Sequence, residues 1–173
     1  ATGIQFASFN TIYQLFDDLK KERLRKATDF LFLPQYFVYL LTGIKKHEYT
    51  EATTSGLINV ETKQYDVNII KNLGLPIKIF KECELPGTFV GYLKDSISQE
   101  VVGQIKVVLA PSHDTACAFE AIDTEEDAAF LSSGTWSLLG YKLKKANTSD
   151  ESYQANFTNE GGVGYIRYLK NIM

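Results

Sequence analysis

Cysteine and proline are scarce in this chain, and their scarcity excludes several classes of protein. The 173 residues include two cysteines, four prolines and twelve glycines. Such a composition excludes a disulfide-dense mini-protein, a collagen-like repeat and a disordered chain. Cys83 and Cys117 lie far apart in the sequence and share no metal-ligand spacing. We therefore favour a protein with reduced thiols over one with an adventitious disulfide.

An excess of positive charge and long apolar runs are also absent. Eighteen basic and twenty-one acidic side chains give a net charge of −3, which leaves no basic stripe to neutralise nucleic-acid phosphates. The longest apolar runs, such as Phe30–Leu33 and Val107–Pro111, are too short to cross a bilayer. Residues 1–5 lack the basic and apolar regions of a secretory signal. We therefore expect a cytoplasmic protein with no nucleic-acid or membrane partner.

What remains is an ordinary globular composition, with 45% hydrophobic and 23% charged residues. The length is that of one domain, or of one domain and part of another. Hydrophobic spacing predicts a mainly helical first half. The expected helices are Ser8 to about Lys20, the segment from Pro34 to Gly43 with Phe37, Val38, Leu40 and Leu41 buried, and Val67–Leu73. Between them, residues 48–59 suggest a loop with a short buried segment.

Strand patterns appear in the second half, so the fold class is α/β. Strands are expected over Thr88–Leu93, Ile105–Ala110, Ala128–Leu131 and Trp136–Leu143, and a buried helix over Thr115–Ile122. Thr124–Asp127 is interpreted as a charged turn near a domain boundary, and Ala146–Glu160 as a polar, irregular loop.

Two short segments could carry chemistry. Residues 111–115, Pro-Ser-His-Asp-Thr, lie between a predicted strand and a predicted helix, where α/β sheets bind ligands. There Asp114 could accept a proton from a substrate hydroxyl, although an aspartate that merely caps the helix is the commoner case. Residues 132–137, Ser-Ser-Gly-Thr-Trp-Ser, could bind an anion through consecutive amides, or form a plain hairpin turn. No G-x-S-x-G elbow and no metal-ligand cluster is visible.

Several motifs together resemble a known family. In sequence order they are Thr-Gly-Ile-Gln-Phe (2–6), Phe-Asn-Thr (9–11), Leu-Pro-x-Tyr-Phe (33–37), Glu-Tyr-Thr-x-Ala-Thr-Thr (48–54), Ser-His-Asp-Thr-Ala (112–116), Leu-Ser-Ser-Gly-Thr-Trp-Ser-Leu (131–138), Asn-x-Thr-Asn-Glu-Gly-Gly (156–162) and Leu-Lys-Asn-Ile-Met (169–173). The chain resembles the rhamnulokinase branch of the FGGY carbohydrate kinases. That resemblance implies the actin/hexokinase/heat-shock ATPase fold, which is ribonuclease H-like.

The resemblance also implies roles for single residues. Asp114 matches the catalytic base that takes a proton from the sugar's primary hydroxyl as it attacks the γ-phosphate of Mg-ATP. His113, Thr115 and Asn171 match substrate contacts, and Asp114 also touches the sugar. Thr135 matches a nucleotide-phosphate position, so the implied cofactors are ATP and Mg²⁺, with no metal ligand in this chain. Phe9 and Asn10 fall where related kinases place a ring against the substrate.

The same resemblance implies that this chain is an internal fragment. Residues 1–123 match the later part of the sugar-binding domain, and residues 124–173 match the beginning of the ATP-binding domain. The family's first phosphate loop and its adenine site are missing, so we expect the fragment alone to be inactive. An incomplete sheet would also expose an edge strand, through which the chain could self-associate.

Three functions stay open at this point. The resemblance favours a kinase that converts L-rhamnulose to L-rhamnulose 1-phosphate in rhamnose catabolism. A kinase for another ketose or polyol would use the same fold, because a few hydroxyl contacts set the specificity. A sugar-binding module without catalysis is the third alternative. The presence of Asp114 argues against it, because a protein without kinase activity has little reason to keep the catalytic base.

Overall fold

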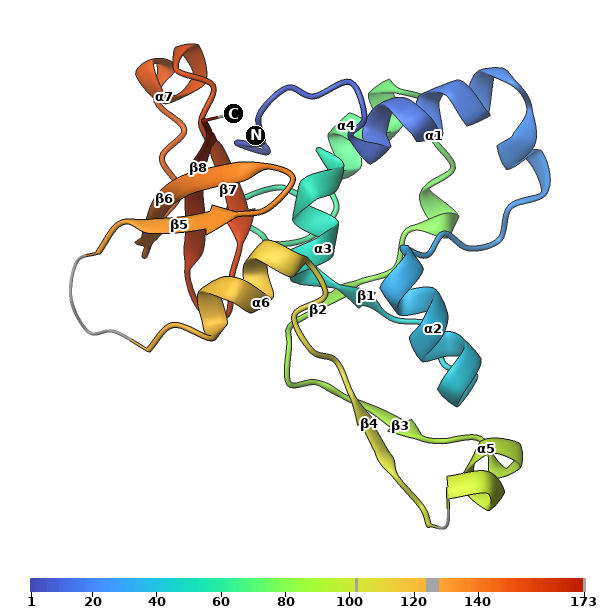
Figure 1. Cartoon of the computed structure of the whole chain (residues 1–173). Helices are drawn as coiled ribbons and strands as arrows, with labels where there is room; N and C mark the ends of the chain where they lie inside the picture. Colours follow the sequence, from blue (N-terminus) through green and yellow to red (C-terminus); the bar gives the residue numbers. More distant parts are fainter. Residues whose placement is uncertain (102, 124–127, 173) are drawn as a thin grey trace.

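Helices dominate the first part of the chain, and an antiparallel sheet forms its last part (Figure 1). The computed structural model describes residues 1–101, 103–123 and 128–172. The helices are α1 (Thr11–Lys20), α2 (Leu33–Thr42), α3 (Tyr49–Ala52), α4 (Val67–Asn72), α5 (Asp95–Val101), α6 (Asp114–Glu120) and α7 (Asp150–Gln154). Short 3-10 turns are η1 (Arg23–Lys26), η2 (Thr53–Ser55) and η3 (Ile77–Ile79).

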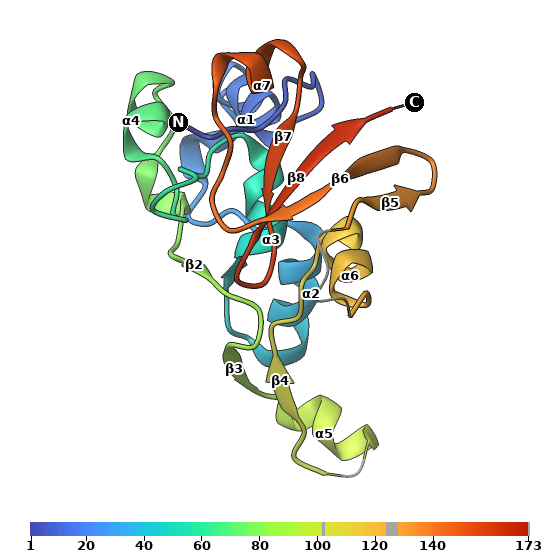
Figure 2. The same cartoon turned by 90° about the vertical axis from the view of Figure 1, so that its left-hand side faces the viewer.

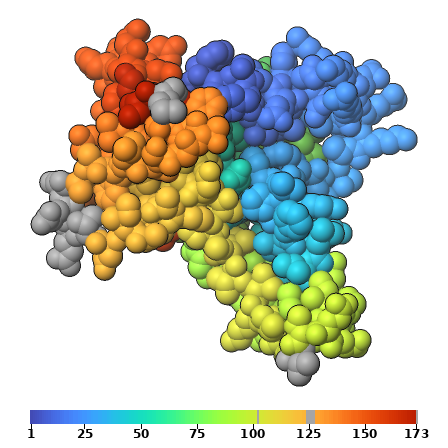
Figure 3. Space-filling model, viewed as in Figure 1, coloured from blue at the N-terminus to red at the C-terminus, as the bar shows by residue number. Residues whose placement is uncertain are grey.

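Over the described residues, the strands form three sheets. They are β1 (His47–Glu48), β2 (Cys83–Glu84), β3 (Phe89–Tyr92), β4 (Lys106–Val108), β5 (Phe130–Ser133), β6 (Ser137–Leu143), β7 (Thr158–Gly161) and β8 (Ile166–Asn171). The largest sheet has the order β5-β6-β8-β7, and its neighbouring strands are antiparallel. The β1–β2 pair is parallel, and the antiparallel β3–β4 pair projects from the body together with α5 (Figures 1 and 3).

Two hydrophobic clusters hold these elements together. The larger one, built around α1, α3, α4 and the β1–β2 pair, includes Leu15, Tyr49, Leu57 and Ile70. The smaller cluster consists of Phe119, Phe130 and Leu169. Because Phe119 comes from α6, Phe130 from β5 and Leu169 from β8, this second cluster packs α6 against the sheet. Figure 2 shows α6 close to β5. The helix that begins at Asp114 is thus anchored on the sheet by a buried ring.

The structure confirms most of the predicted elements. Helix α2 begins at Leu33 with Pro34 in its first turn, and it is capped at its C-terminus by Gly43, whose φ of 79° is the left-handed conformation that favours glycine. Helices α1, α4 and α6 and strands β3, β4, β5 and β6 occupy the predicted segments to within a few residues. The predicted turn over Thr124–Asp127, with the boundary near it, lies outside the described residues.

The predicted buried side of α2 is wrong. Phe37, Leu40 and Leu41 are 56%, 40% and 39% exposed, whereas Gln35 is 1% exposed. Helix α2 contacts the body through Gln35, whose Nε2 donates a hydrogen bond of 2.8 Å to Ser112 Oγ. Apolar spacing identifies a face that favours burial, but it does not show that other parts of this chain cover that face.

The predicted loop over residues 146–160 is wrong, and of the loop with a short buried segment predicted over residues 48–59 only the buried segment is confirmed. In both places polar contacts rather than an apolar pattern order the chain. Residues 146–160 contain α7, where the side chain of Ser149 accepts from Ser152 N, and most of β7, all of whose residues are buried. Residues 48–59 contain α3 and η2, where Thr53 Oγ1 accepts a hydrogen bond of 3.0 Å from Gly161 N. Across the described ranges, no helix has the length and apolar character needed to cross a membrane.

Candidate active site

Asp114 is the first residue of α6, and its side chain is 95% exposed. Its Oδ1 accepts hydrogen bonds from Thr115 N at 2.6 Å and from Thr115 Oγ1 at 3.3 Å. The loop before it follows β4, so the predicted position between a strand and a helix is confirmed. The helix anchors the backbone of Asp114, and the carboxylate remains accessible to a ligand.

A buried carboxylate fixes the loop that leads into α6. Glu48 is fully buried, and its Oε2 accepts hydrogen bonds from Ser112 N at 3.2 Å and from Ser112 Oγ at 2.6 Å. The same side chain accepts from the backbone amides of Thr50 and Glu51 and from Thr50 Oγ1. Glu48 therefore connects α3 to the loop that carries His113 and Asp114.

A cavity of about 470 Å³ opens beside Asp114. Its volume is in the range of small-molecule sites. It is lined by elements from both ends of the chain, among them Gln5, Asn10, Glu51, His113, Asp114, Thr115, Thr135 and Glu160. The mixture of carboxylates, amides and hydroxyls can make many hydrogen bonds, which suits a polyhydroxylated ligand better than an apolar one.

Two aromatic rings meet at the cavity. The ring centroids of Phe9, which precedes α1, and Trp136, in the turn after β5, are 5.6 Å apart. Asn10 stands beside them, and its Nδ2 donates a hydrogen bond of 2.8 Å to Thr54 O. Phe9, Asn10 and Trp136 all line the cavity, so residues that are over a hundred positions apart form one wall.

The structure brings most of the sequence-predicted residues into this one cavity. His113, Asp114, Thr115 and Thr135 line it together. Asn171 is not among the described residues that line it, but in the β6–β8 register it pairs with Leu138, which does. The turn that contains Thr135 connects β5 to β6, and Gly134 N donates to Trp136 O at 2.8 Å.

Sequence reasoning missed three charged residues here. Glu51 and Glu160 line the cavity, and Arg167 is fully buried behind it. Arg167 Nη1 is 3.0 Å from Glu160 Oε2 and 3.2 Å from His113 Nδ1. None of the three stands in a local motif with Asp114, so only the fold reveals their proximity.

Burial changes the proton affinity of two groups at the cavity. It raises the pKa of Glu51 to about 7, and the neighbouring carboxylates of Glu48 and Asp114 act in the same direction. Burial lowers the pKa of His113 below its usual value, although the negative charge of Glu160 opposes this shift. Near neutral pH, His113 is therefore mainly uncharged, and Glu51 is close to its titration midpoint.

Within the described ranges, no group of three or more histidine, cysteine, aspartate or glutamate residues could hold a metal ion. Cys83 is buried and Cys117 is exposed, and both are free thiols.

Comparison with known proteins identifies relatives over almost the whole chain. The model of the FGGY family of carbohydrate kinases, N-terminal domain, matches residues 1–119. A rhamnulokinase of Halalkalibacterium halodurans is 47% identical over 99% of this chain and 38% of that protein. A rhamnulokinase of Oceanobacillus iheyensis is 41% identical over 99% of this chain and 37% of that protein. The chain thus spans well under half the length of these relatives.

Solved structures share the fold at low sequence identity. A gluconate kinase from Lactobacillus acidophilus superposes with a TM-score of 0.82 over 97% of this chain and 34% of its own, at 18% identity. A carbohydrate kinase from Novosphingobium aromaticivorans gives 0.74 over 99% and 39%, at 22% identity. The predicted fold class, part of the actin/hexokinase-like fold of sugar kinases, is confirmed.

Proposed function

Because the chain belongs to the FGGY family of carbohydrate kinases, we propose that it forms the acceptor side of a kinase for L-rhamnulose. The reaction transfers the γ-phosphoryl group of ATP to the C1 hydroxyl of the sugar and yields L-rhamnulose 1-phosphate. One observation supports this most strongly: the carboxylate of Asp114 and the turn around Thr135 line the same polar cavity. An acceptor hydroxyl and a donor phosphate could therefore meet there.

In this proposal, each cavity residue has a defined task. Asp114 takes the proton of the sugar's C1 hydroxyl. At the same time the hydroxyl oxygen of the sugar forms a bond to the γ-phosphorus, and the bond between that phosphorus and ADP breaks. His113 and Thr115 bind the sugar beside Asp114. Asn171 is proposed as a further substrate contact, since it pairs with Leu138 of the cavity wall.

Thr135 is proposed to contact the nucleotide phosphates. Its turn lies between two strands and carries small side chains, which lets backbone amides approach an anion. ATP would bring Mg²⁺ bound to its phosphates, which fits the lack of a metal-ligand cluster among the residues that the structure describes. When bound, the ion offsets negative charge on the transferred group.

We further propose that residues 1–123 belong to the sugar-binding domain and residues 124–173 to the ATP-binding domain. The family model of the N-terminal domain ends at residue 119, close to this division. We place the protein in the cytoplasm. The activity itself is proposed for the longer protein with the length of the relatives, called here the full-length kinase.

The test is a coupled assay for ADP formation by the full-length kinase with L-rhamnulose and a panel of other ketoses and polyols. We expect turnover of L-rhamnulose, and a fall in kcat of at least about 100-fold in Asp114→Asn. Asp123→Asn, an exposed carboxylate changed in the same way, serves as the control and leaves kcat unchanged.

Other results would replace the proposal. Turnover of a different sugar alone would keep the fold and the base but change the substrate. Sugar binding without turnover of any sugar would favour the non-catalytic binding module.

A further inference from the structure

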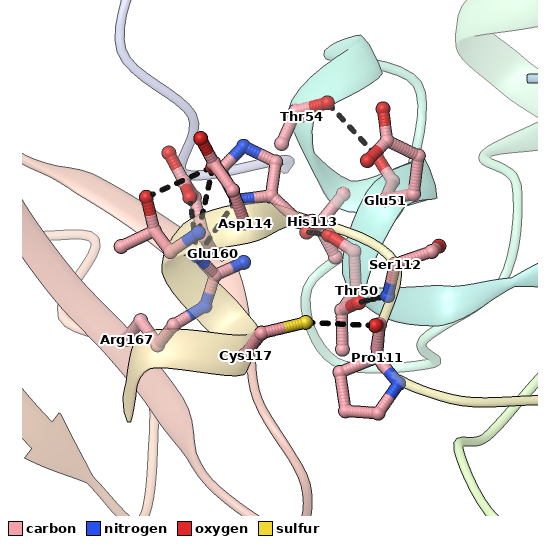
Figure 4. Close-up of polar contacts among 12 residues, drawn as sticks. Thr50, Glu51, Thr54, Pro111, Ser112, His113, Asp114, Cys117, Glu160 and Arg167 are labelled. Atoms are coloured by element: carbon pink, nitrogen blue, oxygen red, sulfur yellow. Dashed lines mark hydrogen bonds and ion pairs between the residues drawn. The ribbon is translucent and has the colours of Figure 1, made fainter. Parts of the chain in front are cut away.

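Arg167 is the largest fully buried side chain among the described residues. A buried guanidinium is costly unless charged or polar groups surround it. Its Nε donates a hydrogen bond of 2.8 Å to Gly161 O, and its Nη1 pairs with Glu160 at 3.0 Å. The same Nη1 lies 3.2 Å from His113 Nδ1, so the guanidinium extends from β8 to the loop before α6 (Figure 4).

This contact decides where the proton of the His113 ring lies. A guanidinium only donates hydrogen bonds, so the Nδ1 atom that faces it has to accept. The ring is then neutral, and its proton is on Nε2. His113 lines the cavity, so this Nε2–H is the ring's donor for a ligand there.

The contact also decides what Asp114 binds. His113 Nδ1 is 3.4 Å from Asp114 Oδ1, so a proton on Nδ1 would engage the carboxylate. With Arg167 donating to Nδ1, that proton is absent, and Oδ1 accepts instead from the backbone amide of Thr115 at 2.6 Å. Arg167 thus prevents a hydrogen bond between His113 and Asp114, so that the histidine remains a donor and the carboxylate an acceptor for a ligand.

We propose that Arg167 is a positioning residue that holds His113 as the neutral Nε2–H tautomer, so that His113 donates a hydrogen bond to a sugar oxygen and Asp114 stays free to act as a base. The consequence for sugar binding rests on the proposed function, whereas the tautomer does not. Arg167 lies on β8, 54 positions after His113. Its contact with His113 therefore connects the sheet to the loop that carries Asp114.

The first test is nitrogen NMR of the imidazole rings in the 173-residue chain. The chain has only two histidines, so His47 provides an internal reference. We expect the His113 spectrum of the unmodified chain to show a protonated Nε2 and an unprotonated Nδ1 near neutral pH. A protonated Nδ1 would overturn the proposal, and this measurement needs no variant that has to fold.

Variants then separate positioning from simple stabilisation. Methionine has a similar length to arginine and cannot donate a hydrogen bond. In Arg167→Met we expect the His113 proton to redistribute toward Nδ1, and in the full-length kinase we expect KM for the sugar to rise about tenfold, the size of one lost hydrogen bond. Arg25→Met makes the same change at an exposed position and leaves both readouts unchanged. If Arg167→Met is folded but its His113 tautomer is the same, Arg167 is only structural.

A double-variant cycle provides the rescue test. The side-chain amide of His113→Gln donates a hydrogen bond without any choice of tautomer, so Arg167→Met should raise KM much less in that background than in the natural one. An equal increase in both backgrounds would overturn the positioning role. If the kinase phosphorylates no sugar while NMR shows the Nε2–H tautomer, the proposed function fails and the assignment of Arg167 to His113 stands.

Discussion

Glu51 shares the cavity with Asp114, and its charge is expected to set how the site responds to pH. Burial raises the pKa of Glu51 to about 7, so the side chain is neutral below that pH and negative above it. An additional negative charge beside Asp114 would disfavour the approach of ATP phosphates. We therefore expect kcat/KM of the full-length kinase to fall as pH rises through 7.

Glu51→Gln keeps the shape of the neutral acid and cannot ionise. We expect this variant to retain activity and to lose the fall above pH 7, measured as kcat/KM for the sugar against pH. Glu61→Gln removes an exposed carboxylate outside the cavity and should keep the natural profile. The same fall in Glu51→Gln as in the natural enzyme would assign it to another group.

At this scale, the sequence predicted the residues that stand in one motif and missed those that the fold brings in. His113, Asp114 and Thr115 are consecutive, and Thr135 stands in a turn whose small residues are visible by themselves. Arg167 and Glu160 become part of the site only because β7 and β8 pair beside α6. No spacing in the sequence encodes that pairing.

At the scale of elements, Glu48 holds α3 and the α6 loop together. It accepts five hydrogen bonds from Thr50, Glu51 and Ser112 while fully buried. In Glu48→Gln an amide group would face some of these donors, so we expect the chain to lose about 2–3 kcal/mol of unfolding free energy. Urea titration measures this, with the exposed Glu82→Gln as control. A loss no larger than that of the control would contradict the anchoring role.

The β1 strand carries a second buried polar residue, His47, which makes the free energy of unfolding depend on pH. Its Nδ1 lies 2.7 Å from the hydroxyl of Tyr65. Burial lowers the pKa of His47 from 6.5 to about 4, so between these values the unfolded chain binds more protons than the folded one. This contribution to stability is fully present above pH 6.5 and is lost as pH falls toward 4.

We expect the unfolding free energy of the chain to decrease between pH 6.5 and pH 4 through this residue. His47→Gln removes the titrating ring, so its unfolding free energy should depend less on pH over the same range. Urea titrations at several pH values compare the two slopes. Identical slopes would show that His47 is accessible to protons in the folded state.

Element prediction from the sequence succeeded where local signals were strong and failed where tertiary contacts decide. Pro34 and Gly43 mark the two ends of α2 through their backbone preferences. Strand β7 has no apolar alternation, although Thr158, Asn159 and Glu160 are all buried. Asn159 donates a hydrogen bond to Gly3 O, and Glu160 pairs with Arg167. A polar strand of this kind looks like a loop until its partners are known.

On the scale of the whole molecule, the two edges of the main sheet differ in how far other segments cover them. The β7 edge is covered, since Asn159 N donates to Gly3 O at 2.9 Å and Gly161 N donates to Thr53 Oγ1 at 3.0 Å. The β5 strand forms the opposite edge, and Leu131 on it is 57% exposed. An apolar edge strand is a template for pairing with a second chain.

We therefore expect the 173-residue chain to self-associate through β5, so that its mass in size-exclusion chromatography with light scattering rises with concentration. Leu131→Lys places a charge on this edge, which disfavours strand addition, and should shift the chain toward monomer. Tyr153→Lys adds the same charge at a 76% exposed position on α7 and should leave the association unchanged. A constant monomer mass in the unmodified chain, or equal effects of the two lysines, would show that β5 is not the contact. The exposed apolar face of α2, with Phe37 and Leu40, would then be the next surface to test.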